Sequence, residues 1–178
     1  GLAQLLWLLP TALTTVNFAR RTAASDVNRH AQKTAMIMRV TLWGSLVPCA
    51  ALYLAAPWLA PTIYGEAYAR SGLVIQAIMP GIWMALIFKV LNSDLAGRGK
   101  PHAALWVYGL ALIINIVLNL IWIPIYGCIG AAWASSVSYT FGGLVFAFAY
   151  AQMSELKVLD VLIPRKSDIY ALKKSLHF

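Results

Sequence analysis

Few side chains in this sequence could bind a charged or polar ligand, and those that could are embedded in long apolar runs. Lys89 lies near the end of one run, and Asn92 follows three positions later on the same helical face. An ionisable side chain within a membrane span is costly and is therefore a functional candidate. Lys89 either faces a wet cavity together with Asn92 or extends its ammonium to the nearest aqueous boundary.

Two other apolar runs supply the remaining candidates. Arg39 lies early in the second run and has the same two interpretations as Lys89. Asn115 and Asn119 are four residues apart and so share one face of a helix. Amides in lipid need hydrogen-bond partners, so this pair either fastens neighbouring helices together or lines a polar cavity.

Asp94 follows Lys89 by five residues, which places it roughly 140° around a helix. That spacing does not favour an ion pair between the two within one helix. We place Asp94 instead at the Gly-rich turn that follows. The apolar runs then contain no carboxylate that could carry a proton.

No sequence pattern points to catalysis or to a bound metal. Cys49 and Cys128 belong to no Cys-x-x-Cys or Cys/His spacing, and the three histidines are scattered. The sequence has no phosphate-binding loop, nucleophile elbow or zinc-protease motif. We therefore expect a protein that is not an enzyme and that holds no metal or cofactor.

The elements that must position these candidates are long apolar helices. Hydrophobic residues make up 61% of the 178 residues and charged residues 11%, against about 45–50% and about 25% in soluble domains. About 20 apolar residues cross a bilayer as a helix, and these runs are too evenly apolar for barrel strands. We expect an all-α, polytopic bundle of five transmembrane helices at about residues 2–18, 35–56, 72–92, 102–123 and 127–150.

Charge divides the connecting segments into two sets. Of the 14 Lys and Arg residues, all but Arg70 lie in three regions that a five-helix serpentine brings to one side. The positive-inside rule places these regions and the C-terminus in the cytoplasm. The residues expected to set this topology are Arg20, Arg21, Arg29, Lys33, Arg98 and Lys100. The net charge of +8 lies between apolar runs, which excludes a nucleic-acid-binding face.

The fifth predicted helix carries a face of small residues, which lets helices approach closely and predicts a packing role. Its members are Gly127, Gly130, Ala131, Ser135 and Gly142. The basic tail, residues 154–178, follows this helix and is interrupted at Pro164. Ile169, Leu172 and Leu176 recur there at helical spacing, so the tail either ends in a helix on the membrane surface or is a solvated segment.

Three stretches together resemble one family. They are YGEAYARSGLVIQAIMPG, LAGRGKPHAALW and NIVLNLIWIPIYGCIGAAWASSVSYTFGGL. Their order and spacing are similar to the C-terminal half of bacterial polysaccharide flippases, which belong to the multidrug/oligosaccharidyl-lipid/polysaccharide exporter superfamily. The likeness covers most of residues 35–150. The passage over the outer turn matches at Pro124, Gly127, Gly130, Ala131, Ala132 and Ala134.

The resemblance implies a two-lobed transporter in the bacterial inner membrane. Such a protein flips undecaprenyl-pyrophosphate-linked oligosaccharide from the cytoplasmic to the outer leaflet for polysaccharide biosynthesis. This chain would be a fragment, most of the second lobe, with membrane lipids, the lipid-linked oligosaccharide and the N-terminal lobe as partners. Lys89 and Arg39 match in kind the basic cavity residues that attract the pyrophosphate. An ion-coupling site would lie in the other lobe or be absent.

Other functions are compatible with the same sequence. A drug/cation antiporter or a peptidoglycan-precursor flippase would have the same fold. A membrane scaffold subunit without a transport cycle is the alternative from another class. Movement of a labelled lipid-linked sugar would separate transport from scaffolding.

Overall fold

The computed structural model describes residues 27–99, 102–165 and 168. Within these residues the chain is helical, and no strand is formed. The elements are α3 (Val27–Gly44), α4 (Leu46–Tyr64), η1 (Glu66–Tyr68), α5 (Ser71–Gly97), α6 (His102–Tyr126), α7 (Cys128–Met153) and α8 (Val158–Leu162). The predicted helix at residues 2–18, the basic residues Arg20, Arg21 and Lys100, and the proposed surface helix after residue 168 lie outside the described residues.

Four helical stretches of the described chain are long and apolar enough to cross a membrane, as a multi-pass membrane protein requires. They are Ala31–Tyr64, Ser71–Gly97, Ala104–Tyr126 and Cys128–Met153. These correspond to the last four of the five predicted helices. The first predicted helix, at residues 2–18, stays a prediction.

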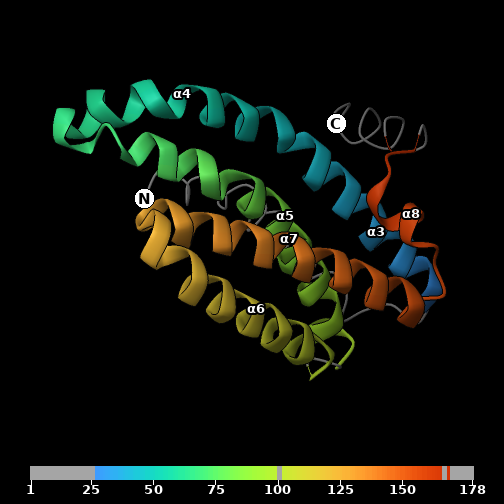
Figure 1. Ribbon diagram of the computed structural model, residues 1–178. Helices are drawn as coiled ribbons and strands as arrows, with labels where there is room; N and C mark the ends of the chain where they lie inside the picture. The colour runs from blue at the N-terminus through green and yellow to red at the C-terminus, as the bar shows by residue number, and fades with distance from the viewer. Residues whose placement is uncertain (1–26, 100–101, 166–167, 169–178) are drawn as a thin grey trace.

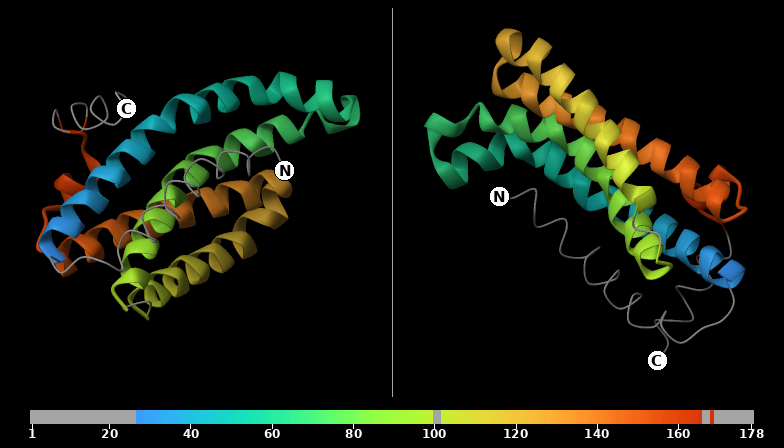
Figure 2. Two further views of the ribbon diagram at one scale, coloured as in Figure 1. Left: turned by 180° about the vertical axis from the view of Figure 1, so that it is seen from behind. Right: turned by 90° about the horizontal axis from the view of Figure 1, so that it is seen from below.

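The helices form two antiparallel hairpins that pack side by side (Figures 1 and 2). α4 and α5 make one hairpin, and α6 and α7 make the other. α5 packs along α7 at the centre, with α4 against α5 and α6 against α7. The most completely buried large side chains include Ile87 and Leu91 of α5 with Phe146 and Tyr150 of α7. The core therefore lies between α5 and α7.

The second predicted helix, at about 35–56, is longer in the structure and is divided by a turn at Ser45. Its first part, α3, includes positions that were expected to form a basic loop. Ala31, Ala35, Met38 and Leu42 recur every three or four residues and are buried, so one face of α3 belongs to the core. Burial of this amphipathic face explains why the helix begins before the apolar run does.

The predicted helices at residues 35–56 and 102–123 stop just before prolines, but the helices of the structure continue past these prolines. Pro57 and Pro61 lie inside α4, and Pro124 lies inside α6. A proline removes one backbone hydrogen bond, whereas ending the helix would expose several backbone groups to lipid. The helices therefore continue to Tyr64 and Tyr126.

Charged side chains collect at one end of the bundle, which we call the charged end. It is formed by α3, α8, the last turns of α5 and α7, and the start of α6 (Figure 1). Among the described residues its charged members include Lys33, Arg39, Asp94, Arg98, Lys157, Asp160, Arg165 and Asp168. Glu66 and Arg70 lie at the opposite end, beside η1. The arrangement matches the predicted division of charge between the two sides.

Candidate functional site

A cavity of about 450 Å³ lies between α5, α6 and α7. Lys89 of α5 and Asn115 of α6 both line it, so the fold brings together two residues that the sequence placed on separate helices. Tyr139 of α7 closes another side. We call this space the α5–α6–α7 cavity. It offers an ammonium group and an amide within largely apolar walls.

Aromatic rings form the wall next to Lys89. Phe88 stacks on Tyr108 with ring centroids 5.1 Å apart, and Phe146 lies behind both rings. Gly142 of α7 makes this arrangement possible, because a Cβ there would lie 2.9 Å from the Cβ of Ala111 and would also collide with the Phe88 ring. The small residue predicted for packing thus fixes the aromatic wall of the cavity.

The asparagines of α6 have both of the roles that the sequence left open. Asn115 Nδ2 donates to Ser135 Oγ of α7 at 3.3 Å, and Asn119 Nδ2 donates to Asn115 Oδ1 at 2.9 Å. The pair therefore fastens α6 to α7. Asn115 also lines the cavity, whereas Asn119 lies one turn farther along α6. Asn92 is half-buried on α5, outside the lining of this cavity as the described residues define it.

Arg39 does not reach toward the α5–α6–α7 cavity. Its side chain is 6% exposed and binds Asp168 with two hydrogen bonds, Nε to Oδ2 and Nη2 to Oδ1, each 2.7 Å long. Its Nη1 donates to the carbonyl oxygen of Asp160. Arg39 was predicted to face a wet cavity or to extend to the aqueous boundary. The structure pairs it with Asp168 of the tail, and the same side chain lines a second cavity beside that pair.

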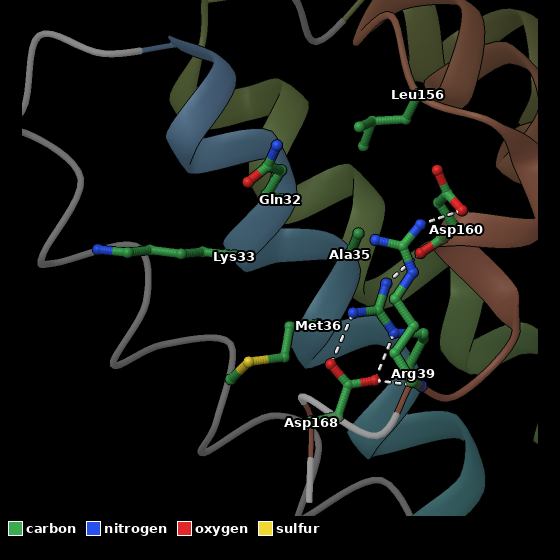
Figure 3. Close-up of a pocket in the computed structure, with 9 residues that line it drawn as sticks. Gln32, Lys33, Ala35, Met36, Arg39, Leu156, Asp160 and Asp168 are labelled. Atoms are coloured by element: carbon green, nitrogen blue, oxygen red, sulfur yellow. Dashed lines mark hydrogen bonds and ion pairs between the residues drawn. The ribbon is translucent and has the colours of Figure 1, made fainter. Parts of the chain in front are cut away.

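The tail is held against α3 by further bonds. Trp43 Nε1 donates to the carbonyl oxygen of Leu162 at 2.8 Å, and Arg165 forms an ion pair with Asp160. We call the bonds from Arg39 and Trp43 to residues 160–168 the tail clasp. A cavity of about 360 Å³ lies beside it. Figure 3 shows Arg39 turned toward Asp168 and Asp160, while Lys33 extends away from them.

The tail clasp determines the ionisation of Asp168. Hydrogen bonds from the Arg39 side chain, helped by the backbone N–H of Arg165, hold the pKa of the Asp168 carboxyl below its ordinary value. Burial acts in the opposite direction and is the weaker effect. At neutral pH the clasp is therefore a pair of full charges.

Asp94 is the functional candidate that the sequence reasoning missed. It was expected at an exposed turn, but it lies inside α5 and is 1% exposed. Thr34 Oγ1 donates to its Oδ1 at 2.9 Å, and the Tyr150 hydroxyl donates to its Oδ2 at 2.6 Å. Arg98 Nη2 pairs with Oδ2 at 2.7 Å. We call these four residues the Asp94 cluster. The i, i+4 spacing of Asp94 and Arg98 was the available signal.

Three of the residues predicted to set the topology fall within the described part of the chain. Arg98 belongs to the Asp94 cluster, and Lys33 is exposed on α3. Arg29 falls within α3.

Four of the five small residues predicted to pack α7 against its neighbours are buried or half-buried. Gly130 and Gly142 are buried, and Ala131 and Ser135 are half-buried, as packing residues should be. Gly127 is exposed and has a φ of +56°, so it serves the turn before α7 and does not pack between helices.

Among the described residues, no group of three or more His, Cys, Asp or Glu side chains is placed to hold a metal ion. Comparison of the chain with protein-family models, with curated proteins and with solved structures finds no match.

Proposed function

We propose that this chain is part of a bacterial inner-membrane transporter that flips lipid-linked oligosaccharide from the cytoplasmic to the outer leaflet. The observation that carries the proposal is the α5–α6–α7 cavity, where Lys89 and Asn115 share one space with the stacked rings of Phe88 and Tyr108. Each kind of group suits one part of such a ligand. The ammonium attracts a phosphate, the amide bonds to hydroxyls, and aromatic faces pack against sugar or isoprenoid.

The position of the polar groups along the bundle supports this function. Lys89 lies about two turns before the end of α5, on the side of the charged end. Asn115 lies near the middle of the 25-residue helix α6. The cavity therefore lies in the half of the bundle nearer the charged end and reaches about mid-depth. A headgroup that crosses hydrocarbon needs polar partners along such a route.

The distribution of charge along the bundle supports the direction of transport that we propose. We place the charged end in the cytoplasm, since basic segments of membrane proteins remain on that side. Lys89 then lies in the cytoplasmic half of the bundle, on the side from which a ligand of the cytoplasmic leaflet would arrive. A second lobe would close the cavity from the other side, so we expect no transport by residues 1–178 alone.

Transport of a labelled undecaprenyl-pyrophosphate-linked sugar by the intact protein in proteoliposomes tests the proposal. Lys89→Ala should reduce the initial rate about tenfold or more, because it removes a charge-assisted hydrogen bond worth about 1.5–3 kcal/mol. Lys89→Arg keeps the charge and should retain most of the activity. Lys157→Ala is the matched control, since Lys157 is an exposed lysine outside the cavity.

Two results would contradict the proposal. Equal and near-normal rates for Lys89→Ala and Lys89→Arg would show that Lys89 only reaches the aqueous boundary. An intact protein that neither binds nor moves the labelled lipid would favour the scaffold function.

A further inference from the structure

The Asp94 cluster joins three helices at the charged end. Asp94 of α5 receives a hydrogen bond from Thr34 of α3 and another from Tyr150 of α7. Arg98 pairs with Asp94 and also donates to the Tyr150 hydroxyl at 2.9 Å and to Ser154 Oγ at 3.3 Å. The guanidinium carbon lies 5.3 Å from the centre of the Tyr150 ring. A single carboxylate thus connects α3, α5 and α7.

The two charged members of the cluster differ in their freedom to move. The Asp94 side chain is 1% exposed and the Arg98 side chain 18% exposed. Arg98 is the residue immediately after α5, between Gly97 and Gly99, and Gly99 has a φ of +68°. A change in this glycine-flanked turn would carry the guanidinium out while the carboxylate stayed in place. A buried carboxylate that loses an ion-pair partner is strongly unfavourable, so the rest of the cluster would rearrange.

α3 is the helix that such a rearrangement would release. Thr34 and Arg39 are five residues apart, which places them on different faces of α3. One face is held to α5 and α7 by the Asp94 cluster, and another is held to the tail by the clasp. α3 joins α4 through the turn at Ser45, next to Gly44, where an added Cβ would meet no atom within 4 Å. The Leu42 carbonyl oxygen beside this turn accepts hydrogen bonds from Ser45 Oγ and from Trp83 Nε1 of α5, so the turn stays attached to α5 and is the point about which α3 can pivot.

We propose that the Asp94–Arg98 pair is a reversible lock that fixes α3 to α5 and α7 at the charged end. When Arg98 leaves Asp94, α3 swings about the Ser45 turn and the charged end opens. The lock is a property of this bundle and does not depend on which ligand, if any, the protein transports.

Spin-label distances in the full-length protein, reconstituted in lipid nanodiscs, test the lock. One label replaces exposed Gln32 of α3 and the other replaces exposed Gln152 of α7, in a background that lacks Cys49 and Cys128. The locked protein should give one narrow distance. Asp94→Asn and Arg98→Gln should each add a longer, broader population, and the double variant should add no more than either single change.

Glu66→Gln is the matched control, because it neutralises a carboxylate at the opposite end and should leave the distance unchanged. An unchanged narrow distance in both single variants would overturn the lock, as would additive effects in the double variant. If Asp94→Asn does not fold, Arg98→Gln decides the question, since it removes the partner of Asp94 and replaces a side chain that is 18% exposed. A longer population in Arg98→Gln supports the lock, and a wild-type distance overturns it.

Discussion

Lys89 and Asp94 lie five residues apart on α5 and meet different surroundings. Lys89 lines the cavity against α6, and Asp94 bonds to Thr34 of α3 and Tyr150 of α7. The spacing predicted that these side chains point in different directions, and the structure confirms it. A charge in an apolar bundle needs partners or water. Asp94 has partners on α3, on α7 and in the turn after α5, whereas the Lys89 side chain lines a cavity.

The close contact of Gly81 in α5 with Ser136 in α7 predicts the effect of a single substitution on stability. A Cβ at Gly81 would lie 3.0 Å from Ser136 Oγ and would collide with the Cα of Ser136, while the Gly81 N–H donates to that Oγ at 2.8 Å. Gly81→Ala should therefore lower the unfolding free energy by about 1–3 kcal/mol through overpacking. Thermal or SDS unfolding in detergent measures the change.

Gly109→Ala is the control for that substitution. Gly109 also lies within a helix, and a Cβ there would meet no atom within 4 Å. It should stabilise the protein slightly, because alanine is the better helix former. Equal effects of the two substitutions would mean that α5 and α7 are not in close contact at Gly81.

At the scale of elements, α3 and the tail depend on each other. α3 is more polar than the spans that follow it, and its buried face packs on α5 and α8. α8 has only five residues, which is too short for a stable isolated helix. Its attachment comes from Val161, which is fully buried, and from the bonds of the tail clasp. The described part of the tail is therefore held in place by α3 and not by the helix propensity of α8.

The tail clasp predicts a pH dependence. Asp168 has a lowered pKa when docked, and its ordinary pKa is about 3.9 when the tail is detached. A lowered pKa stabilises the docked tail fully above the ordinary value, and this contribution disappears as the pH falls through the docked value. We expect the tail to stay docked at neutral pH and to detach progressively below about pH 4. The distance between spin labels at Gln32 and Ile163 reports this change.

Two substitutions show whether Asp168 or Asp160, the other carboxylate at the clasp, causes the pH dependence. Asp168→Asn should detach the tail already at pH 7 and remove the pH dependence. Asp160→Asn should keep the transition, because Arg39 bonds to the backbone carbonyl of residue 160 and not to its carboxylate. A transition that persists in Asp168→Asn and vanishes in Asp160→Asn would assign it to the Arg165–Asp160 pair instead.

The whole molecule is a bundle with two unlike ends. The charged end contains the Asp94 cluster and the tail clasp, and the other end contains η1 and the short turn between α6 and α7. α5 is central because it contacts α4 and α7 along its length and lines the candidate cavity with α6. Movement of α5 would therefore affect both the cavity and the lock.

The proposed orientation predicts which positions a reagent can reach from outside the cell. In a background without native cysteines, Glu66→Cys should react with a membrane-impermeant maleimide in intact cells, because η1 lies at the end opposite the charged end. Lys157→Cys should react only after the membrane is opened. Both positions are exposed, so the difference reports sidedness and not burial. The reverse pattern would place the charged end outside.

The sequence by itself determined the helices and the sorting of charge, because both follow from local composition. Apolar runs of sufficient length specify spans, and basic segments collect at one end. It also selected Lys89 and Asn115 as candidates, since polar groups in such runs are conspicuous. Their cavity could not be predicted, because it depends on how α5, α6 and α7 pack.

Only the tertiary structure decided which charges are buried and paired. Arg39 and Asp168 lie 129 residues apart in sequence, and Thr34 and Asp94 lie 60 apart. No local pattern joins such positions, since a side chain finds a distant partner only when packing has fixed the register of the helices. The same fact explains why Asp94, placed at a turn by its neighbours in sequence, is a buried carboxylate that bonds to three other residues.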